Sequence, residues 1–390
     1  MKNFILIFFL LGNYAIAQES NKTIKAIHFN PEFSYKMLDS NRDLRKVNIL
    51  LREKEKGTIT TKSLLIGTSL ISIFDYQKSN TDSKFAYLMR HPTSNNQIGK
   101  EVSEVVVHSF QVSITALVSN WLTAYAEILY NPEQSFGKGT ITTLNRNQLQ
   151  LRKGFVVFGS LKKFPLYVAI GKMDAPFGQM ESVSPFTNST MWHAFGGLGY
   201  GVQIGLKKDG FHAKFMAVQG GAQFRAMHTP VGDSINVPSK INNFVADINY
   251  RTTILKKAKL YFGASYLHGS AYCQYFPVMH FSACADNNPA VTYYGKLMVK
   301  DRLALKRAFA TTLKIWKGTH NPTPPLDVFK ASKVTSLDLG VKYDLNKNEN
   351  LKYTLSGEFS NFRAGAIGSP WERQNQIVIG FSALYKKSTT

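Results

Sequence analysis

The chain has 390 residues, and its 47 Lys and Arg against 25 Asp and Glu give a formal net charge of +22. Aromatic residues make up 13% of the sequence, and the mean hydropathy is −0.16. Beyond the N-terminal region no stretch of about 18 apolar residues occurs, which excludes membrane-spanning helices. Two classes remain, a soluble β protein and a β-barrel, whose alternating lipid-facing and lumen-facing residues average to near-neutral hydropathy.

The N-terminus has the pattern of a secretory signal peptide. Lys2 supplies a positive charge, residues 4–11 form an apolar run, and Ala15-Ile16-Ala17 is a small-x-small cleavage site. Because the apolar run is too short to span a bilayer, we predict that residues 1–17 are a cleaved signal peptide. Export argues against nucleic acid as the partner of the basic charge, and the sequence carries no zinc-finger or helix-turn-helix pattern. Anionic headgroups or anionic solutes are then the expected partners.

Residues 18–60 differ in composition from the rest of the chain. They are rich in Lys, Arg, Asn and Glu and contain few aromatic residues. Leu44, Val47 and Leu51 are spaced three and four apart, which predicts one short amphipathic helix in a periplasmic N-terminal segment. A solvated, partly ordered arm fits the same residues equally well.

From Leu64 onward the hydrophobic pattern has a period of two, as in strands with one face against lipid. In residues 200–207, Tyr, Val, Ile and Leu alternate with Gly, Gln and Lys, and the alternation resumes after Lys208-Asp209-Gly210. This predicts a hairpin with a tight Asp-Gly turn. Segments of this kind predict about 14 strands, with a range of 12–16, near residues 64–77, 104–118, 121–130, 147–159, 165–173, 198–207, 210–220, 241–251, 258–268, 291–300, 304–316, 333–343, 350–361 and 374–386.

The connections between these strands alternate in length. Short ones lie near residues 119–120, 162–164, 208–209, 255–257 and 346–350, and long ones at 131–146, 174–197, 221–240, 269–290, 318–332 and 362–373. Short periplasmic turns and long external loops are typical of outer-membrane barrels. In lipid only a closed sheet leaves no unpaired edge. We therefore predict an all-β fold: a transmembrane antiparallel β-barrel over residues 61–390, in the bacterial outer membrane.

One segment resembles a known family. Residues 166–178 combine a strand that ends in Gly171-Lys172 with Pro176-Phe177-Gly178 ahead of a long connection. This combination resembles the LbtU-type siderophore porins and, more loosely, the phosphate-selective outer-membrane porins. The resemblance is best over residues 100–210. It implies passive, plug-free uptake of a ferric siderophore. Such barrels often end in an aromatic residue, whereas here Tyr385 is followed by five more residues.

The strand register predicts an excess of cations on the inner face. The expected lining residues are Arg152, Lys214, Arg251, Lys259, Lys296 and Lys314, together with the anions Glu127 and Asp247. Lysine and arginine side chains in a narrow pore attract anions, so we expect an anionic solute such as a ferric siderophore or phosphate. For cations at strand ends, such as Lys207, Lys300, Lys342 and Lys352, contact with lipid headgroups is the alternative.

Two connections carry further expectations. The one after residue 173 contains Pro176, Phe177, Gly178, Trp192 and His193, and it is either a constriction loop folded into the pore or, more simply, an external loop. In the connection at 269–290, Cys273 and Cys284 predict one local disulfide in an oxidising compartment, with two free thiols as the alternative.

Nothing in the sequence indicates an enzyme. We find no Gly-x-Ser-x-Gly, His-Glu-x-x-His or Walker pattern, and the nine histidines show no metal-ligand spacing, so no catalytic site, metal or cofactor is expected. The expected partners are outer-membrane lipid, lipopolysaccharide and the barrel-assembly machinery, with a homotrimer or a monomer equally consistent. Besides a siderophore channel, the sequence allows a non-specific anion-selective porin, a non-conducting adhesive or structural barrel, and a secreted soluble sandwich.

Overall fold

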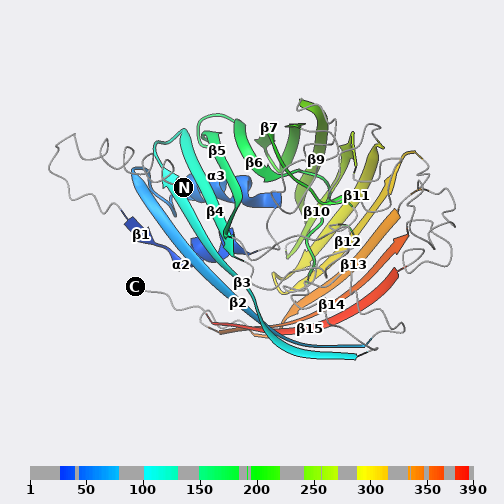
Figure 1. Ribbon diagram of the computed structural model, residues 1–390. Helices are drawn as coiled ribbons and strands as arrows, with labels where there is room; N and C mark the ends of the chain where they lie inside the picture. The colour runs from blue at the N-terminus through cyan, green and yellow to red at the C-terminus, as the bar shows by residue number, and fades with distance from the viewer. Residues whose placement is uncertain are drawn as a thin grey trace, which may run out of the picture.

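The computed structural model describes residues 27–39, 44–78, 101–130, 149–183, 191, 195–219, 241–255, 257–270, 288–314, 333, 335–346, 351–363 and 374–385. The predicted signal peptide and the predicted Cys273–Cys284 disulfide lie outside these residues. Figure 1 shows the whole chain as a ribbon, in which one long sheet dominates.

Three short elements precede the main strands: β1 (Ile27–Phe29), α2 (Pro31–Leu38) and α3 (Lys46–Lys56). The side chain of Asn30 caps α2 by accepting a hydrogen bond of 3.0 Å from the Phe33 amide, and a proline occupies the first helical position. Helix α3 ends at Gly57, which adopts the left-handed conformation (φ 75°). The helix expected around residues 44–51 is therefore present as α3, and α2 is a second helix that the spacing did not indicate.

The described residues contain no helix with the length and hydropathy needed to cross a membrane.

All 14 predicted strands are present, and each observed bound lies within four residues of its prediction. They are β2 (Ser63–Lys78), β3 (Glu101–Leu117), β4 (Leu122–Tyr130), β5 (Leu149–Gly159), β6 (Leu166–Asp174), β7 (Leu198–Lys208), β8 (Phe211–Gln219), β9 (Ile241–Leu255), β10 (Ala258–Leu267), β11 (Ala290–Val299), β12 (Leu303–Thr312), β13 (Thr335–Asp344), β14 (Leu351–Arg363) and β15 (Gln374–Tyr385).

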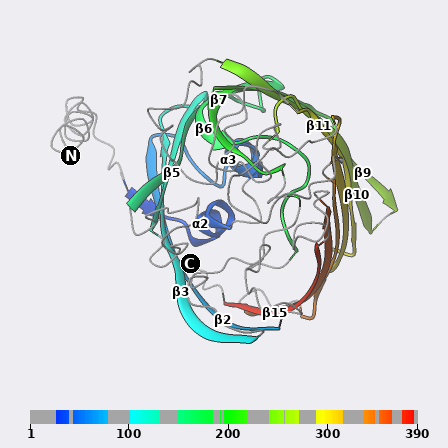
Figure 2. The same cartoon turned by 45° about the vertical axis from the view of Figure 1, so that its right-hand side comes forward.

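The strands form a single sheet in chain order, with each of β2 to β14 antiparallel to the next. The sheet curves round until β15 returns beside β2 (Figure 1 and Figure 2). The short strand β1 is parallel to the first residues of β2, with Ile27 opposite Leu64. In the part of the chain that the structure describes, the recorded ladders run from β1 to β15 and none joins β15 to β2.

Tight turns join several of these strands. Asp209 and Gly210, between β7 and β8, both have positive φ (48° and 84°), as a two-residue type I′ hairpin requires. A Cβ atom on Gly210 would lie 2.2 Å from the Arg251 carbonyl oxygen, so no other residue fits there without a shift of the backbone. The predicted Asp-Gly hairpin is confirmed. Lys300 and Asp301 form a similar turn between β11 and β12.

The sheet has an apolar outer face and a polar inner face. Ile204, Phe215 and Ile248 are about half exposed, whereas Gln203 and Asp247, which alternate with them, are buried. A soluble protein would place these two sets the other way round. An apolar exterior around a polar interior, with consecutive strands from β2 to β15 hydrogen-bonded to one another, is the arrangement of a barrel that crosses lipid. The predicted fold class, a transmembrane antiparallel β-barrel of the outer-membrane type, is confirmed.

Candidate functional site

The interior of the barrel contains part of its own chain. Helices α2 and α3 lie within the ring of strands in Figure 2, against the inner face of the sheet. Lys46 of α3 forms an ion pair with Glu127 of β4, and the Lys54 ammonium donates a hydrogen bond of 2.9 Å to the Thr123 hydroxyl. The described part of the N-terminal segment therefore packs inside the sheet rather than standing apart from it.

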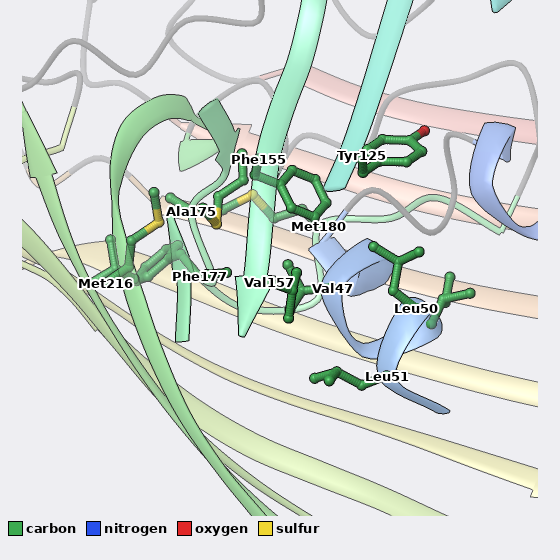
Figure 3. Packing of buried hydrophobic residues seen from close by; sticks show 14 of the residues in the cluster. Val47, Leu50, Leu51, Tyr125, Phe155, Val157, Ala175, Phe177, Met180 and Met216 are labelled. Carbon is green, nitrogen blue, oxygen red and sulfur yellow. The ribbon is translucent and has the colours of Figure 1, made fainter. Parts of the chain in front are cut away.

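Apolar contacts also hold the helices. Figure 3 shows Val47 and Leu50 of α3 near Val157 of β5 and Tyr125 of β4, and all four side chains are buried. These wall residues face the inside of the barrel, where a water-filled pore would favour polar side chains. The apolar patch on the inner wall thus matches the apolar face of the helix.

Glu127 is the centre of a buried charged cluster. Its carboxylate pairs with Lys46 and with Arg152 (3.1 Å), and it accepts a hydrogen bond of 2.8 Å from the Tyr125 hydroxyl. Arg152 reaches this site because it is the extra residue of a β-bulge in β5, opposite the step from Glu127 to Ile128. The next residue, Lys153, forms an ion pair of 2.7 Å with Asp174 at the end of β6.

Residues 175–183, here called the inner segment, also lie inside the barrel. They follow β6 and reach the opposite wall, where the Gly178 amide donates to the Ser265 hydroxyl of β10 (2.9 Å). The Ser182 hydroxyl and the Val183 amide both donate to the carboxylate of Glu358 on β14, at 2.8 and 2.5 Å. The sequence allowed either a constriction loop or an external loop after residue 173. Residues 175–183 are not an external loop, because they contact the inner wall. Pro176, Phe177 and Gly178 belong to the inner segment, whereas Trp192 and His193 lie outside the described residues.

The inner segment and the N-terminal residues are joined to each other. The Arg45 guanidinium, just before α3, donates to the Glu181 carboxylate at 3.0 Å. Lys306 of β12 donates to the main-chain oxygen of Glu181 and also pairs with Asp338 at 2.5 Å. A chain of charged contacts therefore crosses the lumen from the helices to the far wall.

Lys214 and Asp247 lie on the inner wall, as the register predicted. They form an ion pair of 3.0 Å, and the Asp247 carboxylate also accepts hydrogen bonds from Asn249 (2.7 Å), Ser265 (2.7 Å) and Tyr294 (2.5 Å). A buried carboxylate with this many donors is fully satisfied and structurally fixed. This cluster therefore belongs to the wall itself.

The remaining predicted lining residues divide into two groups. Arg251 and Lys296 are each paired in register with the inward-facing Tyr261. Lys259, in contrast, forms an ion pair of 2.8 Å with Asp301, and both side chains are exposed at the rim. Lys314 is exposed and lies beyond the end of β12. Both residues lie near strand ends, so their role in lining the pore stays a prediction.

Sequence reasoning missed several charged residues of the lumen. The inward position of Lys306 could have been predicted, because Lys306 and Lys314 lie an even number of positions apart in one predicted strand and so share a face. Lys153 could not, since only the bulge brings two successive basic residues to the same face. Arg45, Lys46 and Glu181 depend on segments whose inward position no local pattern encodes.

Partial burial of Lys54, which also lies on α3, lowers the pKa of its ammonium group.

No cluster of three or more His, Cys, Asp or Glu side chains that could hold a metal occurs among the described residues.

No protein-family model matches the chain, and no curated protein matches it either. Among solved structures, it is similar to OmpF of Salmonella typhi in complex with daunomycin, at 10% identity over 83% of this chain and 86% of that chain, with a TM-score of 0.48. It is similar also to the outer-membrane channel DcaP of Acinetobacter baumannii, at 11% identity over 82% and 97%, with a TM-score of 0.40. A mutant of the Rh. blastica porin matches at 10% identity over 82% and 100%, with a TM-score of 0.36. The barrel architecture rests on the chain's own strand order, register and apolar exterior.

Proposed function

We propose that the protein is an outer-membrane channel for small anionic solutes. The observation that carries the proposal is the charged inner wall beneath an apolar exterior. Burying charges costs free energy, and a barrel whose only role is structural could fill its centre with apolar side chains. A wall that carries Lys214, Arg251, Lys296 and Lys306 is suited instead to polar solutes and water.

A basic group near the inner segment supports a preference for anions. Lys296 and Lys306 face each other on β11 and β12. The Lys296 ammonium lies within electrostatic range of Arg45, Lys306 and Lys342, with Glu181 and the Lys306 partner Asp338 as the nearby anions. A local excess of positive charge at a narrowed point raises the concentration of anions there and repels cations.

The solute we propose carries carboxylate or phosphate groups. A ferric siderophore is the more specific form of this proposal, which the resemblance of residues 166–178 implies, and one of the carboxylate type would suit a basic lumen. Iron uptake by a deletion strain, measured with radiolabelled iron with and without a supplied siderophore, tests this form. Equal uptake in the deletion and complemented strains would remove the siderophore and leave smaller anions as the proposed solutes.

Ion selectivity tests the channel itself. In planar bilayers under a KCl gradient, we expect the wild-type protein to show a reversal potential that indicates chloride preference. Lys296→Glu should shift that potential toward cation preference. Lys163→Glu is the matched control, since this exposed residue lies in the β5–β6 turn and should leave selectivity unchanged. Cation preference in the wild type would contradict the proposal.

The filled lumen favours one alternative, a non-conducting structural or adhesive barrel. Helices α2 and α3 and the inner segment occupy the interior, and many of their side chains are buried. This alternative predicts no conductance in the same bilayers and loss of surface attachment in a deletion strain that still takes up iron.

A further inference from the structure

The contact between α3 and the wall can break without leaving an unpaired charge on the wall. Removal of one partner from a buried ion pair is normally costly because the other charge stays buried alone. Here Glu127 would keep Arg152 at 3.1 Å and the Tyr125 hydroxyl at 2.8 Å after Lys46 leaves. The freed Lys46 ammonium would be hydrated. The arrangement is therefore compatible with repeated opening.

Two further polar contacts between α3 and the wall, among the described residues, are single side-chain hydrogen bonds. The Asn48 side chain contacts the His212 ring at 3.2 Å, and Lys54 donates to Thr123 at 2.9 Å. The strands, by contrast, are joined by continuous backbone ladders. Helix α3 therefore contacts the wall through side chains and not through a backbone hydrogen-bond ladder.

Both ends of the same segment are fixed, since α3 leads within a few residues into β2 and β1 pairs with β2 on the other side. Strand β1 forms a backbone ladder with β2 from Ile27 opposite Leu64 to Phe29 opposite Ile66. Asn30 follows at once and caps α2. The helices thus have a hydrogen-bonded anchor on their N-terminal side, which would hold them to the barrel after they leave the wall.

The wall has a matching apolar surface for these helices. Leu65, Leu117 and Val157 face inward and are buried in one cluster with Val47 and Leu50. Inward-facing aliphatic side chains would be poorly placed in an empty aqueous pore. The docked position is accordingly the resting position.

We propose that helices α2 and α3 form a tethered plug, anchored by β1, whose departure from the wall opens the channel, and that the contact of Lys46 with Glu127 is its latch. This inference rests on the proposed function, since a plug has a role only in a barrel that conducts. It adds that conduction is controlled by the chain's own N-terminal helices.

A reversible tether tests the plug in the full-length protein. In a background with Cys273→Ser and Cys284→Ser, Lys54→Cys and Thr123→Cys are joined by a short, cleavable bis-maleimide. We expect the joined protein to show about fivefold or more lower mean conductance in planar bilayers than the same protein after cleavage of the linker. The matched control joins Thr123→Cys to Val157→Cys, which are opposite each other on β4 and β5, and its conductance should not respond to cleavage.

The outcomes separate the two proposals. Equal conductance before and after cleavage, in a protein that conducts, overturns the plug and leaves the channel standing. Absence of conductance in every form, including the wild type, overturns the channel and with it the plug. Heat-modifiable migration on gels verifies that each variant has folded as a barrel.

The latch is tested separately by Lys46→Gln. Loss of one hydrogen bond to a charged group changes an equilibrium roughly tenfold or more, so the open fraction should rise by about that factor. Lys56→Gln removes the same charge from an exposed position on the same helix and should behave as the wild type. If Lys46→Gln also behaves as the wild type, Lys46 is not the latch.

Discussion

Lys46 on α3 and Glu127 on β4 form an ion pair in which the two side chains are 2% and 0% exposed. The two residues lie 81 positions apart in the chain, so the contact joins the segment before the barrel to its wall. Because Glu127 also binds Arg152 and Tyr125, the two sides of the pair are not equivalent. Substitutions of the two residues should therefore have different effects on stability.

Glu127→Gln should destabilise the barrel more than Lys46→Gln. The first substitution leaves two buried cations without their carboxylate, and breaking a buried pair in this way costs about 3–5 kcal/mol. The second leaves Glu127 with Arg152 and Tyr125, so the loss should be about 1.5–3 kcal/mol, the range for one hydrogen bond to a charged group. Urea unfolding in lipid vesicles, followed by gel mobility, measures both. Equal losses would show that Arg152 does not compensate for Lys46.

Ile204→Lys should strongly impair the folded barrel in lipid. Ile204 is exposed on the outer face of β7, and a lysine at the bilayer midplane costs about 2–4 kcal/mol, against about 0–1 near the interface. Phe164→Lys is the matched control, because Phe164 is equally exposed but lies in the β5–β6 turn. The same unfolding assay applies. A soluble protein would tolerate both substitutions, and that result would contradict the membrane orientation.

Glu358→Ala should release the inner segment from the wall, because this carboxylate accepts hydrogen bonds from both Ser182 and Val183. Gln179→Cys, in a background without native cysteines, reports the change, since Gln179 is buried within the segment. Its rate of reaction with a polar thiol reagent should rise about tenfold or more, as expected when a local opening loses more than 1.4 kcal/mol. Ser356→Ala, on the same strand but bonded to the Gly380 carbonyl, should leave the rate unchanged.

Lys54 should titrate at a lower pH in the folded protein than in the unfolded chain, where its pKa is 10.5. Burial lowers the pKa because it disfavours the charged ammonium. Between the folded-state pKa and 10.5 the unfolded chain binds more protons, so the contribution of Lys54 to stability rises with pH across that window. Competitive amine labelling with mass spectrometry gives the titration midpoint in both states. A folded midpoint at or above the unfolded one would contradict the partly buried position of Lys54.

The strands could be predicted because lipid imposes a simple rule on them. Each residue that faces hydrocarbon must be apolar, so the period of two persists through strands such as β7, in which Ile204 is exposed and Gln203 is buried. The same rule placed Lys214 and Asp247 on the inner wall. The Asp209-Gly210 turn was readable because few other pairs adopt positive φ at both positions.

The contents of the lumen could not be predicted in the same way. The spacing of Leu44, Val47 and Leu51 indicates a helix with an apolar face, but it does not tell whether that face meets a protein partner or the barrel wall. The Asn30-Pro31 start of α2 was a readable signal, since it combines a capping side chain with a proline at the first position. The inward course of the inner segment depends on distant residues such as Glu358, which no local pattern reveals.

The contact of Arg45 with Glu181 has a mechanical consequence. It links the helices on one side of the barrel to a segment held by the opposite side, so the interior works as a cross-brace over the full width of the cylinder. Any departure of the helices would remove this brace, so the cylinder that admits a solute would also be the more deformable one.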